Sequence, residues 1–208
     1  MKYFGSIFII AAASGTGKTT LATAVNEAIP DTLVSISHTT RPMRTGDREG
    51  NTYFFVDDKT FANMVDADKF LEHAKVFGYS YGTSRDFVLR NLEQGKDIIL
   101  DIDWQGAQKV RKALSDLAVS IFLLPPSREA LQQRLMTRSR DPEEIIADRM
   151  AKAHGEMVHY KEFDYLIIND NFEQALQEIK SIIQAQRLKC ERQANKYASL
   201  IKELLQNQ

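Results

Sequence analysis

The feature that most constrains this chain is a glycine-rich segment near its beginning, which follows an apolar run over residues 7–13. The segment reads AASGTGKT over residues 12–19 and leads into residues with helical spacing. Glycine at positions 15 and 17 permits backbone conformations that other residues disfavour, so several N–H groups can face one concavity. A helix that begins near Lys18 adds the positive end of its dipole. Strand, loop and helix together predict a site for phosphate groups.

The side chains of this segment favour a nucleoside triphosphate. Lys18 can reach the β- and γ-phosphates, and the Thr19 hydroxyl can ligate Mg²⁺. Ala12 stands where such loops usually have their first glycine. The alternative is a glycine-rich turn with a solvated lysine, which is disfavoured because strand, loop, lysine, hydroxyl and helix all line up. The predicted phosphate-binding residues are Ala12, Ala13, Ser14, Gly15, Thr16, Gly17, Lys18, Thr19 and Thr20.

Apolar runs without alternation recur at residues 98–100, 119–124 and 165–168. Such runs are typical of strands buried on both faces of a parallel sheet. The segments between them have helical spacing, so we expect an α/β fold with a parallel sheet flanked by helices.

Two stretches interrupt this alternation. Glycines punctuate residues 35–84, and residues 53–56 are aromatic and β-prone, which predicts a small inserted β-rich lobe. Residues 137–149 are polar and charged, which favours an exposed mobile lid. The expected division of this single domain is a core of about residues 1–34, 85–136 and 150–188, a lobe of about 35–84, a lid of about 137–149 and a C-terminal helix of about 189–208.

Composition narrows the classes of partner. The formal net charge of the 208 residues is −1, which gives no electrostatic reason to expect nucleic acid or an anionic membrane. Cys190 is the only cysteine, and the four histidines show no metal-site spacing, so neither a disulfide framework nor a zinc site is expected. No apolar run approaches the roughly 20 residues that cross a bilayer. We expect a soluble cytoplasmic protein.

Five further motifs follow the phosphate loop in order. They are SHTTRPMR at residues 37–44, GNTYFF at 50–55, FLEHA at 70–74, YGTS at 81–84 and LDIDWQG at 100–106. In order and spacing they closely resemble the guanylate kinase family, from about Ile7 to about Leu188. The resemblance implies a P-loop kinase core with an inserted nucleoside monophosphate-binding lobe and a short helical lid. It also implies transfer of the γ-phosphate of ATP to GMP, with Mg²⁺ as cofactor and dGMP as a further acceptor.

The resemblance assigns the acceptor site. The residues implied for the GMP phosphate are Arg41, Arg44, Tyr53 and Tyr81, and those implied for guanine are Ser37, Glu72, Thr83 and Asp103. The chemistry agrees, because Pro42 favours an extended chain that projects Arg41 and Arg44 the same way as a phosphate clamp. Guanine offers N1–H and an amine side by side, and the Glu72 carboxylate can accept from both. Taken alone, Glu72 would instead be an exposed carboxylate on a helix, and the arginines would be solvated.

The donor side is assigned in the same way. Asp101 ends a buried strand, where α/β folds place ligand-binding groups, and can hold Mg²⁺ through water. The resemblance assigns Arg138 and Arg149 to the transferred phosphates, with help from Arg134, and Asn169 to the ATP nucleoside. The predicted catalytic residues are Lys18, Asp101, Arg138 and Arg149.

Two other functions remain open at this point. A kinase for AMP or UMP is disfavoured by the carboxylate of Glu72. A non-catalytic guanylate kinase-like module of the kind found in scaffold proteins is disfavoured because Lys18, Thr19 and the lid arginines are intact.

The tail from Arg187 to Gln208 contains five Lys or Arg and two Asp or Glu, a local charge of +3. A heptad-like seam of apolar residues in it predicts a helix that joins copies of the chain. Docking of this helix on the chain's own core is nearly as well supported. The seam comprises Cys190, Ala194, Tyr197, Ile201 and Leu204.

Overall fold

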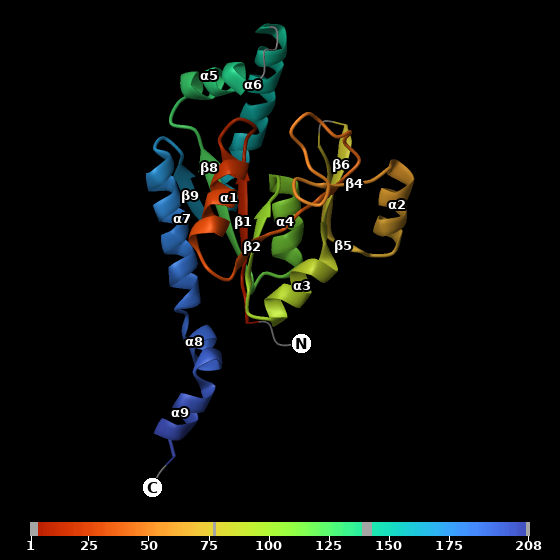
Figure 1. Ribbon diagram of the computed structural model, residues 1–208. Coiled ribbons are helices and arrows are strands. Elements are labelled where there is room, and N and C mark those ends of the chain that lie inside the picture. The colour runs from red at the N-terminus through yellow and green to blue at the C-terminus, as the bar shows by residue number, and fades with distance from the viewer. Residues whose placement is uncertain (1–3, 77, 139–142, 207–208) are drawn as a thin grey trace.

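The computed structural model describes residues 4–76, 78–138 and 143–206 (Figure 1). Its centre is a parallel sheet in the order β2-β7-β1-β8-β9. The strands are β1 (Ile7–Ala12), β2 (Thr32–Val34), β7 (Asp97–Asp101), β8 (Ala118–Leu124) and β9 (Tyr165–Ile168). The apolar runs thus form strands as predicted, and the α/β fold class is confirmed.

Helices cover both faces of this sheet, which explains why its strands are continuously apolar (Figure 1). In β1, Phe8 and Ile10 face one side, where they pack with α1 (Lys18–Ala28) and α7 (Phe172–Arg187). Ile7 and Ile9 face the other side, toward α3 (Arg85–Glu93) and α4 (Trp104–Ala113). Alternating residues of one strand therefore anchor two separate cores.

A second, four-stranded sheet forms the inserted lobe, in the order β4-β3-β6-β5. It consists of β3 (His38–Thr39), β4 (Phe54–Phe55), β5 (Phe70–Val76) and β6 (Tyr79–Ser84), with α2 (Asp58–Asp66) beside it. The β5–β6 pair is antiparallel and its register shifts between Phe70 and Glu72. This lobe packs on the core through α4, which contacts β5.

Two helices lie over the phosphate loop, α5 (Arg128–Arg138) and α6 (Glu143–Met157), and a 3₁₀ turn follows at η1 (Val158–Glu162). Leu131 and Leu135 of α5 pack with Ile146 and Ala153 of α6 against Ala13. The predicted lid corresponds to the junction of these helices, and its residues 139–142 lie outside the described residues.

The C-terminal segment differs from the prediction of one continuous helix. It forms two short helices, α8 (Cys190–Lys196) and α9 (Ala198–Leu204), because Tyr197 leaves the helical conformation at φ −107° and ψ 25°. Together they extend away from the core (Figure 1). Within the described parts of the chain, no helix is long and apolar enough to span a membrane.

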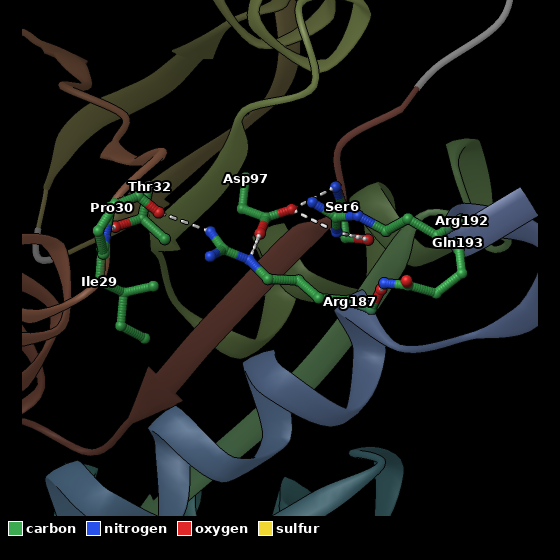
Figure 2. A network of polar contacts seen from close by, with 8 residues as sticks. All are labelled: Ser6, Ile29, Pro30, Thr32, Asp97, Arg187, Arg192 and Gln193. Carbon is green, nitrogen blue, oxygen red and sulfur yellow. Dashed lines mark hydrogen bonds and ion pairs between the residues drawn. The ribbon is translucent and has the colours of Figure 1, made fainter. Parts of the chain in front are cut away.

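An ionic network attaches this segment to the core (Figure 2). The fully buried Asp97 carboxylate accepts from Arg187 Nε at 2.7 Å and from Arg192 Nη1 at 2.7 Å. The backbone N–H of Ser6 donates to the same carboxylate at 2.8 Å. Because each charge is paired, Asp97 fixes the end of α7 and the start of α8 beside the parallel sheet.

Candidate active site

The predicted phosphate loop lies between β1 and α1, at the carboxyl edge of the parallel sheet. Gly17 caps α1 with φ 98°, in the left-handed region that favours glycine. A Cβ at this position would also lie 2.7 Å from Asn169 Nδ2. The amide of Asn169 donates to the carbonyl of Thr16 at 2.7 Å, so it braces the loop from behind.

Lys18, Thr19 and Asp101 form one hydrogen-bonded group. Asp101 Oδ1 lies 2.8 Å from Lys18 Nζ, and Asp101 Oδ2 accepts from Thr19 Oγ1 at 2.6 Å. Burial alone would lower the pKa of Lys18, but the charge and hydrogen bond of Asp101 outweigh it and leave that pKa above its ordinary value. The lysine is therefore held as a cation at the base of the loop.

The Thr19 hydroxyl and the Asp101 carboxylate fit the predicted Mg²⁺ site. Both are hard oxygen donors on adjacent elements, which is the ligand type that Mg²⁺ prefers. Within the described residues, no cluster of three His, Cys, Asp or Glu side chains could hold a metal by itself. A Mg²⁺ ion here would therefore complete its shell with phosphate oxygens and water, as this ion usually does.

A cavity of about 610 Å³ joins the phosphate loop to the inserted lobe. Most of the predicted site residues line it, including the whole loop and both aspartates. The lining residues that were predicted are Ala12, Ala13, Ser14, Gly15, Thr16, Gly17, Lys18, Thr19, Thr20, Ser37, Tyr53, Glu72, Tyr81, Asp101 and Asp103. The predicted residues that are described but do not line it are Arg41, Arg44, Thr83, Arg149 and Asn169.

Glu72 is a buried carboxylate on β5, with 5% of its surface exposed. The reading as an exposed carboxylate on a helix is therefore wrong. Thr83 Oγ1 donates to Glu72 Oε1 at 2.5 Å, so Thr83 stands behind Glu72 and away from the cavity. Burial, reinforced by the charge of Asp103, raises the pKa of Glu72 to about 7 despite the Thr83 hydrogen bond.

Asp103 has a structural role in addition to its place in the cavity. It caps α4, and its Oδ1 accepts from the backbone N–H of Gly106 at 2.8 Å. Asp101 and Asp103 both line the cavity.

The two arginines of the predicted clamp differ in environment. Arg41 is buried, whereas Arg44 is exposed. Arg41 Nη2 donates to Asp47 Oδ2 at 2.8 Å, and the same oxygen accepts from the backbone N–H of Arg44 at 2.8 Å. The guanidinium of Arg41 lies 5.2 Å from the ring centre of Tyr53, which itself lines the cavity. Sequence reasoning missed Asp47, which holds Arg41 in place.

Two further residues line the cavity near the phosphate loop. Arg134 of α5 donates to the carbonyl of Asn169 at 2.9 Å. Glu156 of α6 accepts from the backbone N–H of Ser14 at 3.2 Å, and burial raises the pKa of its carboxyl. Glu156 was not predicted, although it follows Arg149 by seven residues, which puts both on one side of α6.

The lid arginines are less directly placed. Arg149 is partly buried on α6 and does not line the cavity. The side chain of Arg138, the last residue of α5, lies outside the described side chains.

Comparison with known proteins agrees with this geometry. The family model for guanylate kinase matches residues 5–186. The guanylate kinase of Legionella pneumophila (strain Lens) is 52% identical over 98% of this chain and 97% of its own length. That of Coxiella burnetii (strain RSA 493 / Nine Mile phase I) is 51% identical over 98% of each chain. The crystal structure of guanylate kinase from Anaplasma phagocytophilum superposes with a TM-score of 0.78 and 34% identity, over 92% of this chain and 90% of that one. The chain therefore belongs to the guanylate kinase family.

Proposed function

We propose that the chain transfers the γ-phosphate of ATP to GMP, and to dGMP, in the cavity between the phosphate loop and the inserted lobe. The observation that carries this proposal is the lining of the cavity, which combines Lys18 and Thr19 with the buried carboxylate of Glu72. The first two suit a triphosphate, and the third suits a base that presents adjacent donors.

ATP binds through the phosphate loop in this proposal. The backbone N–H groups of residues 13–17 and the Lys18 ammonium hold the β- and γ-phosphates. Thr19, and Asp101 through water, would hold a Mg²⁺ ion, which would supply positive charge to the phosphates. Asn169 acts on the ATP side by bracing the loop, since its side chain bonds to the carbonyl of Thr16.

GMP binds on the side of the inserted lobe. Glu72, Ser37 and Asp103 contact guanine, and Thr83 supports them by orienting Glu72. Tyr53 and Tyr81 line the path to the phosphate, and Arg41 and Arg44 supply its positive charge after a local rearrangement around Asp47.

The reaction requires charge neutralisation and in-line positioning more than proton transfer, because the acceptor phosphate is already ionised near neutral pH. We nominate no general base. Lys18, Arg138 and Arg149 stabilise the charge that develops on the transferred phosphoryl group. Closure of the lobe and lid excludes water and so prevents hydrolysis of ATP.

In the cell, this activity belongs to purine nucleotide metabolism and GMP recycling, and we propose that it takes place in the cytoplasm. We also propose that copies of the chain associate through the C-terminal segment. Its apolar side chains Tyr197, Leu200, Ile201, Leu204 and Leu205 are exposed.

A panel of nucleoside monophosphates tests the proposal. With ATP and Mg²⁺, release of ADP should depend on GMP or dGMP and be far slower with AMP or UMP. A preference for AMP or UMP would overturn the assignment of the acceptor. Absence of turnover with every acceptor, together with binding of a phosphopeptide, would favour a non-catalytic module.

A further inference from the structure

Helix α4 passes unusually close to the Glu72 carboxylate at Gly106, the third residue of the helix. A Cβ on Gly106 would lie 2.7 Å from Glu72 Oε2 and 3.2 Å from its Cδ. Nonbonded carbon atoms normally approach to about 3.5–4.0 Å. The missing side chain at position 106 therefore provides the space that the carboxylate occupies.

Neither side of this contact can easily move. Glu72 is buried and held by the Thr83 hydroxyl at 2.5 Å, so a displaced carboxylate would lose that hydrogen bond. Helix α4 is fixed at its start, because the backbone N–H of Gly106 bonds to Asp103. The next residues toward the core, Ala107 and Val110, are fully packed there. Figure 1 shows the helix between the parallel sheet and the inserted lobe.

Glycine is also a poor residue for the body of a helix, where alanine is more favourable. The helical position alone therefore gives no reason for glycine at 106. The close approach to Glu72 gives that reason, because both carboxylate oxygens must be held at fixed places to accept from two adjacent donors.

We propose that Gly106 is a positioning residue for recognition of the acceptor base, because it lets α4 hold the Glu72 carboxylate at the depth where guanine meets it. This inference rests on the proposed role of Glu72. Alanine at 106 pushes the carboxylate away from Thr83 and from its place in the cavity, so binding of GMP weakens while binding of ATP does not.

The test uses four variants of the full chain: Gly106→Ala, Glu72→Asp, the double variant, and Gly155→Ala as the matched control. Gly155 also lies in a helix, α6, and a Cβ there meets nothing within 4 Å. Glu72→Asp withdraws the carboxylate by one methylene, about 1.5 Å, which makes room for a methyl group at 106. Steady-state rates with GMP, AMP and ATP, and thermal unfolding, are measured for each.

Gly106→Ala should raise the KM for GMP by about tenfold and narrow the preference for GMP over AMP to a similar extent, with the KM for ATP unchanged. Gly155→Ala should change none of these. Glu72→Asp alone should also lose about tenfold with GMP, and the double variant should lose no more than Glu72→Asp alone.

If the losses with GMP in Gly106→Ala and Glu72→Asp multiply in the double variant, the two positions act independently. That result would overturn the inference while leaving the role of Glu72 intact. An unchanged base preference in Glu72→Asp would overturn both the role of Glu72 and the inference. If Gly106→Ala fails to fold, the double variant decides, since the inference requires it to fold and to match Glu72→Asp.

Discussion

Replacing Glu72 by glutamine should strengthen the fold while it weakens guanine recognition. Glu72 is buried on β5, and its pKa rises from 4.5 to about 7 because burial disfavours the charged form. Between these two pH values the folded chain keeps a proton that the unfolded chain has lost. Stability therefore falls as pH rises through this window, and the full loss is present above it.

The magnitude follows from the two pKa values. At about 1.4 kcal/mol for each pH unit, the ionised carboxylate costs about 3 kcal/mol at pH 8 and about 1 kcal/mol at pH 5. Glutamine has nearly the same shape and cannot ionise, and its carbonyl oxygen can still accept from Thr83. The free energy of unfolding of Glu72→Gln minus that of the wild type should therefore increase by about 2 kcal/mol from pH 5 to pH 8.

Urea unfolding followed by circular dichroism at the two pH values measures this gain, and comparison within each pH cancels all other titrating groups. Glu27→Gln, at an exposed glutamate on α1, is the control and should show no such change. In parallel, kcat/KM with GMP at pH 8 should fall at least about tenfold, whereas AMP should lose nothing. A constant difference in stability across the pH range would refute the buried, ionisable carboxylate.

Three further changes test other parts of the site. Lys18→Met should lower turnover by about 10²–10³ without unfolding the chain, and near-normal turnover would remove the phosphate-loop assignment. Arg138→Ala should lower kcat far more than it raises the KM for GMP, whereas a pure KM effect would indicate ground-state binding. Deleting residues 198–208 keeps Arg192 on Asp97 but removes α9, so light scattering should show a smaller, still active assembly. An unchanged mass would exclude α9 as the interface.

The sequence predicted the parallel strands well because burial on both faces leaves a plain signal. The run at residues 7–13 became β1, and its alternate side chains Phe8 and Ile9 belong to opposite cores. The order of strands could not be predicted from composition, since pairing of β1 with β7 joins residues about ninety positions apart. The C-terminal helix was predicted from apolar spacing alone, and that spacing does not register the break at Tyr197.

Within the candidate site, local motifs were predicted and tertiary partners were missed. Lys18 and Thr19 follow from the short phosphate-loop pattern, whose geometry is set by neighbours in sequence. The hydrogen bond from Ser14 to Glu156 joins residues 142 positions apart, so no local pattern contains it. The pairing of Arg41 with Asp47 is closer in sequence, but it depends on a turn whose conformation the composition does not fix.

Two buried carboxylates, Asp97 and Glu72, illustrate what distinguishes a structural charge from a binding charge. Asp97 accepts hydrogen bonds from two arginines and a backbone N–H, so its charge is balanced by partners within the chain. Glu72 has the neutral hydroxyl of Thr83 as its hydrogen-bonding partner and faces a cavity. The fold therefore offsets the charge of Glu72 less completely than that of Asp97. A base with two adjacent donors would supply further hydrogen bonds to the carboxylate. Only a ligand with two adjacent donors offsets the free-energy cost of burying the Glu72 charge. This difference between ligands makes the site selective.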